Sequence, residues 1–249
     1  MNRCGHHIIR RVAVAPAALM VGLSLAPLPA AAQVMDDKIY SFILFDQLEY
    51  RTGGARPVSW DMVGWVGGDF TRFWIKSEGV QATTGGGGDA EVQGLYSRLI
   101  APFWEVQAGL RLDARYGDGE DRIRVLGVFG FEGLAPYWFD IEPVLFVSQD
   151  GDLSARLTAS YDMFFTQRLI AQPQFEANVA VQEVAEFGVG SGFNDIELGV
   201  RLRYEIRREY APYVGVSWLR RFAGTAGLAR LAGDAVSDVA AVGGLRVWF

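Results

Sequence analysis

Apolar and polar residues alternate along most of this chain, which is the pattern of a β-strand with two different faces. The alternation is clearest in residues 104–115, WEVQAGLRLDAR, where even-numbered positions are apolar and most odd-numbered ones are charged or carry an amide. Residues 153–163 and 194–207 repeat it. After Gln33 no helical period of 3.6 residues competes with it, so the pattern predicts an all-β protein with little helix.

The alternation divides the chain into twelve predicted strands. Most are longer than the roughly 5–6 residues usual in globular sheets, and they approach or exceed the roughly 9–11 residues of strands that cross a membrane. Their predicted positions are near 39–51, 58–66, 69–79, 90–100, 103–115, 121–131, 136–147, 152–164, 168–182, 194–207, 211–222 and 237–249.

The lengths of the connections distinguish between the two folds that such alternation allows, a soluble β-sandwich and a membrane barrel. A soluble β-sandwich with one wet face would alternate too. Here long Gly-rich or acidic connections, such as residues 80–89, follow odd-numbered strands, and tight turns, such as Gly67–Gly68 and Ala101–Pro102, follow even-numbered ones. This rhythm, with aromatic residues near the strand ends, is typical of outer-membrane barrels. We therefore predict a closed antiparallel transmembrane β-barrel with both termini on the periplasmic side.

The first residues have the pattern of a secretory leader. An apolar stretch, residues 12–28, follows basic residues and ends in Ala30-x-Ala32. This predicts a signal peptide over 1–32, a short periplasmic segment over 33–38 and a barrel over 39–249. A membrane anchor is the alternative, which two prolines and the short span disfavour.

Removal of the leader changes the charge and the available chemistry. It leaves 20 basic and 29 acidic residues, a net charge of −9, which argues against nucleic acid as a partner. Cys4, His6 and His7, the only residues of their types, leave with it. A nucleophile activated by histidine therefore cannot be built, and we expect no enzymatic activity.

Charged residues gather on the predicted inward face. Their near-balance of sign favours a network of cross-strand ion pairs that fills the lumen, whereas the alternative is a charged permeation path. The predicted lumen-lining residues are Glu105, Arg111, Asp113, Arg122, Arg124, Asp140, Glu142, Arg156, Asp162, Glu176, Glu197, Arg201, Arg203 and Glu205.

Extended stretches of the chain resemble the copper resistance protein B family of Gram-negative outer membranes. The resemblance is carried by MDDKIYSFILFDQLEYR (35–51), GWVGGDFTRFWIKSEG (64–79), EVQGLYSRLIAPFWEVQAGLRLD (91–113), GLAPYWFDIEP (133–143), VSQDGDLSARL (147–157) and GSGFNDIELGVRLRYEIRREYAPYVGVSW (190–218). It implies a barrel of a copper resistance system that contributes to copper export or sequestration beside a periplasmic multicopper oxidase. A general outer-membrane channel or structural barrel without copper specificity is the alternative.

Two ends of the mature chain have expected roles. Leu245, Val247 and Phe249 are predicted to face lipid, and the terminal Phe looks like the signal read by the barrel assembly machinery.

Members of the family often carry a Met- and His-rich segment before the barrel. Here only Met35, Asp36 and Asp37 remain as candidate copper ligands. Because carboxylates match soft Cu(I) poorly, we expect weak copper binding.

Overall fold

The structure is a computed structural model that describes residues 38–53, 57–83, 86–117 and 121–249. These residues belong to one compact unit that begins at Asp37. The predicted signal peptide lies outside the described residues, and so do Met35, Asp36 and Asp37.

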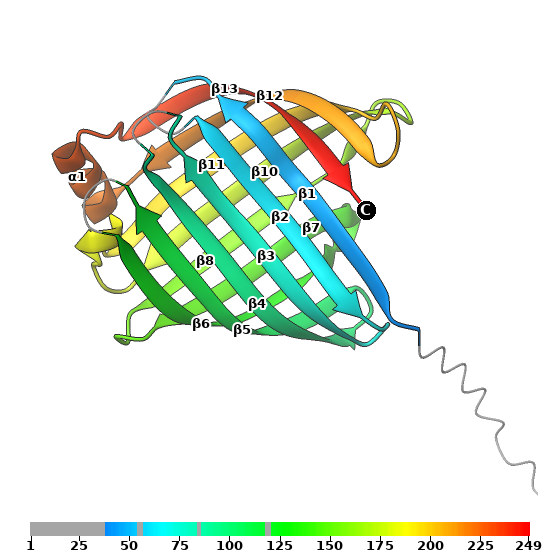
Figure 1. Ribbon diagram of the computed structural model, residues 1–249, viewed down its shortest axis with the longest axis horizontal. Coiled ribbons are helices and arrows are strands. Elements are labelled where there is room, and N and C mark those ends of the chain that lie inside the picture. The colour runs from blue at the N-terminus through cyan, green and yellow to red at the C-terminus, as the bar shows by residue number, and fades with distance from the viewer. Residues whose placement is uncertain (1–37, 54–56, 84–85, 118–120) are drawn as a thin grey trace, which may run out of the picture. The chain divides into compact units, whose positions relative to one another are not determined.

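Antiparallel strands form one continuous sheet that closes on itself (Figure 1). Closure comes from β1, which pairs with β2 on one side and with the last strand, β13, on the other. The strands are β1 (Tyr40–Arg51), β2 (Val58–Gly67), β3 (Thr71–Gln81), β4 (Gly88–Ala101), β5 (Trp104–Tyr116), β6 (Arg122–Ala135), β7 (Phe139–Ser148), β8 (Leu153–Ser160), β9 (Met163–Phe164), β10 (Leu169–Ala180), β11 (Gly192–Tyr204), β12 (Tyr210–Arg221) and β13 (Ser237–Trp248).

Two of these strands act as one strand of the wall. β8 and β9 lie end to end along the same partner, β10. The break between them falls opposite Pro173: the Tyr161 amide donates to the Pro173 carbonyl at 3.2 Å, but proline has no N–H to return. Counted this way the wall has twelve strands, so the predicted twelve-stranded closed barrel is confirmed. The predicted Gly67–Gly68 turn is confirmed too, because the Gly68 amide donates to the Thr71 carbonyl at 3.0 Å.

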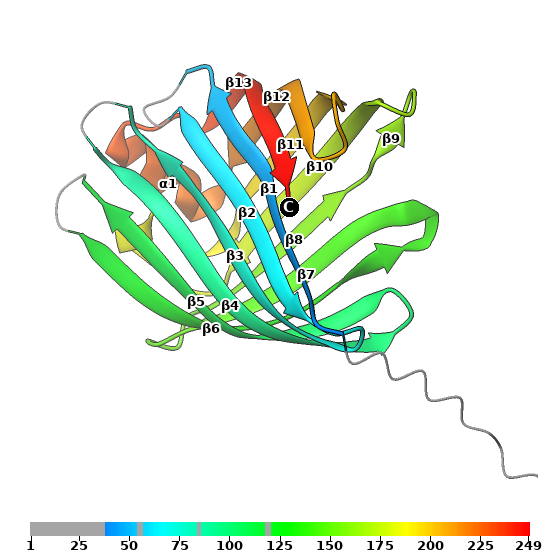
Figure 2. The same cartoon turned by 45° about the vertical axis from the view of Figure 1, so that its right-hand side comes forward.

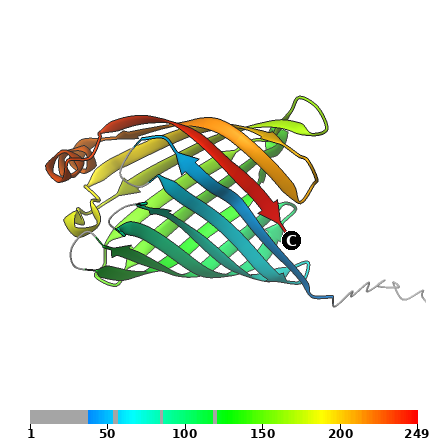
Figure 3. The ribbon, with the colours of Figure 1, turned by 45° about the horizontal axis from the view of Figure 1, so that its top comes forward.

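The two ends of the barrel differ. At one end, called the turn end, lie the short connections, the start of β1 and the chain terminus (Figure 2). Phe249 and Ile43 exchange backbone hydrogen bonds there, at 2.9 and 3.2 Å. At the other end, called the loop end, lie the longer connections and the helix α1 (Figure 3).

Helix α1 (Ala223–Ala232) occupies a connection that the sequence predicted to be a loop. Its buried side is small, with Thr225, Ala226 and Ala229 packed inward, and Gly233 ends it in the left-handed conformation. Glycines lower helix propensity, and the helix is short, so its period was hidden in the sequence. Among the described residues, no helix is both long and apolar enough to cross a membrane.

The alternation sorts side chains as predicted. Leu110 and Val214 on the outer surface are each 63% exposed, as expected of residues that face lipid. The lumen holds charged and amide side chains, but one part of it is apolar. Trp74, Leu95, Leu126, Val128, Val144 and Phe146 form this buried cluster.

The wall has little room at one point where β5 pairs with β4. A Cβ atom at Gly109 would overlap the Gly94 carbonyl oxygen, whereas one at Gly127, on the neighbouring strand β6, would meet nothing nearer than the Val147 carbonyl oxygen at 3.8 Å.

We predict that Gly109→Ala lowers the free energy of unfolding by about 1–3 kcal/mol, because the added methyl group overpacks the sheet. Gly127→Ala serves as the matched control and is expected to unfold like the wild type. Urea unfolding of the refolded barrel, followed by heat-modifiable gel migration, measures both. Equal stability of the two variants would contradict the close approach.

Candidate functional site

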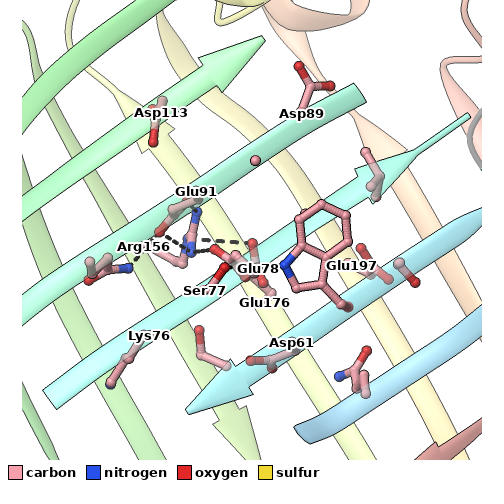
Figure 4. A pocket seen from close by; sticks show the side chains of 18 of the residues that line it. Asp61, Lys76, Ser77, Glu78, Asp89, Glu91, Asp113, Arg156, Glu176 and Glu197 are labelled. Carbon is pink, nitrogen blue, oxygen red and sulfur yellow. Dashed lines mark hydrogen bonds and ion pairs between the residues drawn. The ribbon is translucent and has the colours of Figure 1, made fainter. Parts of the chain in front are cut away.

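A cavity of about 480 Å³ lies inside the barrel and is lined mainly by charged and polar residues (Figure 4). It runs from Arg51 and Arg115 near the loop end to Lys76 and Glu142 deeper in the lumen. Because it brings together charged side chains from opposite walls of the barrel, it is the candidate functional site.

A row of carboxylates crosses four neighbouring strands of its wall. Asp61 lies directly opposite Glu78, Glu78 opposite Glu91, and Glu91 opposite Asp113. Figure 4 shows Glu78 between Asp61 and Glu91. Like charges directly opposite each other destabilise a sheet, so this row depends on cations brought to it from elsewhere.

Arg156 supplies the central cation from the opposite wall. It projects from β8 and forms ion pairs with Glu78 on β3, with Glu91 on β4 at 3.0 Å and with Glu176 on β10 at 3.6 Å. Three wall strands separate β8 from β4, so these contacts tie distant parts of the barrel together across the lumen.

Two further arginines complete the row. Arg111 contacts Glu91 at 2.6 Å and Asp113 at 2.5 Å, and Arg124 contacts the other Asp113 oxygen at 2.8 Å. The guanidinium of Arg111 also lies 4.5 Å from the centre of the Phe146 ring, a favourable cation–π geometry. From Glu78 to Asp113 the carboxylates of the row are therefore bridged by arginines.

A second group surrounds Glu49, whose side chain has no exposed surface. Arg201 donates to both of its carboxylate oxygens, at 3.0 and 3.1 Å. Arg51, Ser59 and Tyr213 donate to it as well, at 2.9, 3.3 and 3.2 Å. Five hydrogen bonds thus compensate the burial of one carboxylate, as a buried charge requires.

A third group lies toward the turn end. Lys76 pairs with Glu132 at 2.9 Å and with Glu142 at 2.6 Å. Closer to the turn end, Arg72 pairs with Glu105 at 2.7 Å. Glu105 also accepts a hydrogen bond from Ser97. Among the described residues, the cavity lining includes Lys76 but neither Arg72 nor Glu105, so this group forms a floor beneath the cavity.

Most of the predicted lumen-lining residues form ion pairs in the structure, within these three groups or beside them. Those with ion pairs are Glu105, Arg111, Asp113, Arg124, Glu142, Arg156, Asp162, Glu176, Glu197, Arg201, Arg203 and Glu205. Arg122 is exposed at the loop end and donates to the Glu186 carbonyl at 2.9 Å. Asp140 is exposed near the turn end, at the start of β7.

The sequence reasoning missed the charged residues of β1 to β4. These are Asp46, Glu49, Arg51, Asp61, Arg72, Lys76, Glu78, Asp89 and Glu91. In β1 a bulge between Phe45 and Leu48 shifts the register, so that neighbouring Asp46 and Gln47 both reach lumenal partners. In β3 and β4 the alternating Lys76 and Glu78, and Glu91 and Gln93, were a usable signal.

We predict that Arg156→Met lowers the free energy of unfolding by about 3–5 kcal/mol, because it leaves several carboxylates in the lumen without their cation. Arg246→Met is the matched control. Arg246 has a single, partly exposed partner, Asp46, so its loss is expected to cost about 1 kcal/mol. Unfolding titrations of both variants test this, and equal losses would contradict the central place of Arg156.

The sequence of this barrel is similar to proteins of one known family. A family model described as "Copper resistance protein B precursor (CopB)" matches residues 39–249. The copper resistance protein B of Escherichia coli is 41% identical over 217 residues, which are 87% of this chain and 72% of that protein. The copper resistance protein B homolog of Pseudomonas syringae pv. tomato is 39% identical over 218 residues, with the same coverage.

Solved structures give more distant likenesses. The KdgM porin has a TM-score of 0.48 and 13% identity, and covers 84% of this chain and 99% of its own. The NanC porin also has a TM-score of 0.48, with 12% identity and the same coverage. Likenesses at this TM-score carry no conclusion about this chain. The family match spans all the strands of the barrel, and this chain therefore belongs to the copper resistance protein B family.

Proposed function

We propose that this chain is an outer-membrane barrel that contributes to copper export or sequestration together with periplasmic partners. The observation that carries the proposal is the extent of the family match, residues 39–249, which begins one residue before β1 and includes every strand. The barrel itself is therefore what the family shares. Copper enters the proposal as cargo and not as a resident cofactor.

The donor set of the barrel does not fit a resident Cu(I) ion. Soft Cu(I) selects thiolate and thioether ligands, and imidazole also suits copper. Cys4, His6 and His7 lie outside the described residues, and Met163 is 44% exposed on the outer face. Within the described ranges, no group of three or more His, Cys, Asp or Glu residues could hold a metal. The wall is therefore not proposed to hold copper.

The proposed setting follows from the two surfaces of the wall. Its outer face is apolar enough to lie among outer-membrane lipids, and long connections belong outside the cell in such barrels. The turn end, where β1 begins and β13 ends, would then face the periplasm. Delivery by the barrel assembly machinery is part of the proposal, with Phe249, which directly follows β13, as part of the signal.

The proposal assigns copper chemistry to a partner. The described residues contain neither histidine nor cysteine, so a His-activated nucleophile cannot be built in the lumen, and the barrel is proposed to be non-enzymatic. The proposed partner is a periplasmic multicopper oxidase that docks near the turn end and oxidises the copper. The competing proposal is a general channel or structural barrel without copper specificity, which the scarcity of soft donors in the wall, where the described strands hold only Met62 and Met163, favours.

Deletion of the gene is expected to raise copper sensitivity, because the proposed route for copper is lost. Re-expression of the full chain should restore tolerance, and Met35→Ala should restore it equally, because one thioether contributes little to binding. Growth across a copper series measures this. Unchanged tolerance after deletion would favour the competing proposal.

Purified folded barrel is expected to show no tight, stoichiometric uptake of Cu(I) when a competing chelator is present, because the wall offers mainly hard oxygen ligands. Single-channel recording in planar bilayers, with and without copper, provides the companion measurement. Stoichiometric uptake that resists the chelator would overturn the assignment of copper as passing cargo.

A further inference from the structure

The connection between β10 and β11, residues 181–191, folds into a compact unit that we call the strap. Val184 and Val189 form an antiparallel bridge, and the short helix η2 (Ala185–Phe187) lies between them. Gly188 follows in the left-handed conformation, with φ of 70°. The strap thus has internal hydrogen bonds of its own and can keep its shape when its outer contacts change.

The tip of the strap reaches toward β5 and β6. Arg115 on β5 donates to the Glu186 and Phe187 carbonyl oxygens, at 3.3 and 3.1 Å, and Arg122 on β6 donates to the Glu186 carbonyl at 2.9 Å. The guanidinium of Arg124 lies 4.4 Å from the Phe187 ring centre. Because β7 and β8 lie between β6 and β10 in the wall, the strap spans the lumen mouth above them.

The root of the strap is fixed differently. The Gly190 amide donates to the Thr225 hydroxyl of α1 at 2.9 Å, and a Cβ atom at Gly190 would overlap the backbone of Gly224 and Thr225. In Figure 3 the strap is the yellow segment beside α1. Its root is therefore packed tightly against the helix, whereas its tip depends on three arginine side chains.

The strap contributes side chains to the lining of the cavity that forms the candidate site. Phe187 and Val189 line the 480 Å³ cavity, and Val184 and Val189 line a smaller cavity of about 160 Å³ beside it. A solute that entered the lumen from the loop end would contact the strap before it reached the carboxylate row.

We propose that the strap is a gate over the loop-end mouth of the lumen, latched by Arg115, Arg122 and Arg124. Release of the tip from these arginines opens the cavity while the root stays on α1. The gate rests on the function proposed above, because only a lumen that is entered needs one. At the tip, the arginines contact backbone carbonyl oxygens and one aromatic ring, all of which are uncharged. Release of the tip therefore leaves no buried carboxylate without its cation.

Access to the cavity can be measured with a thiol reporter beneath the strap. Thr158 lines the cavity on β8, and Thr158→Cys in a Cys4→Ser background makes the reporter the only thiol in the chain. The probe is a sulfonated maleimide, and the readout is its rate of reaction with the folded barrel. Copper is not involved, so the result is independent of the copper phenotype.

Arg122→Gln and Phe187→Ala are the two latch variants. Each is expected to raise the labelling rate up to about tenfold, because the first loses a charge-assisted hydrogen bond and the second a cation–π contact. Arg220→Gln is the matched control. Arg220 is exposed at the loop end and stacks on Phe222, not on a residue of the strap, so the labelling rate of this variant should equal the parent rate. Only variants with native gel migration are compared.

Labelling of a folded latch variant at the parent rate would overturn the gate, even if deletion of the gene raises copper sensitivity. Equal acceleration by Arg220→Gln would also overturn it, because general loosening of the loop end would then explain the access. Faster labelling in the latch variants alone, with unchanged copper tolerance after gene deletion, would keep the gate and reject the copper function.

Discussion

Hydrocarbon offers no hydrogen-bond partner, and this constraint governs the whole molecule. Every backbone group of the wall must be paired within the sheet, which only a closed barrel allows. The pairing of β13 with β1 provides that closure, and the hydrogen bonds between Phe249 and Ile43 extend it to the last residue. The same constraint sends charged side chains inward, where they must find partners among themselves.

The inward charges are arranged so that the walls depend on one another. A row of carboxylates on β2 to β5 would repel itself, and cations from β5, β6 and β8 hold it together. Breaking a buried pair is costly because it strands a charge. Beneath the cavity, the ion pairs of Lys76 and Arg72 form a floor.

The fold could be predicted because strand period, strand length and loop rhythm all indicate the same barrel. The lumen could be predicted only where the alternation is clean. In β1 the bulge near Asp46 changes which residues point inward, and in β3 apolar Trp74 shares the lumenal face with Lys76. No local pattern shows that Arg156 reaches Glu78 and Glu91, because partners 78 and 65 residues apart are set by closure. Helix α1 was missed because it is short and contains glycine.

The central claim is that contacts across the lumen hold opposite walls together. A double-mutant cycle between Arg156→Met and Glu91→Gln tests it most directly, with the free energy of unfolding measured for the wild type, both single variants and the double variant. The account predicts a coupling energy of more than about 1 kcal/mol, as expected for residues in one ion-pair network. Additive effects, within about 0.3 kcal/mol, would contradict it.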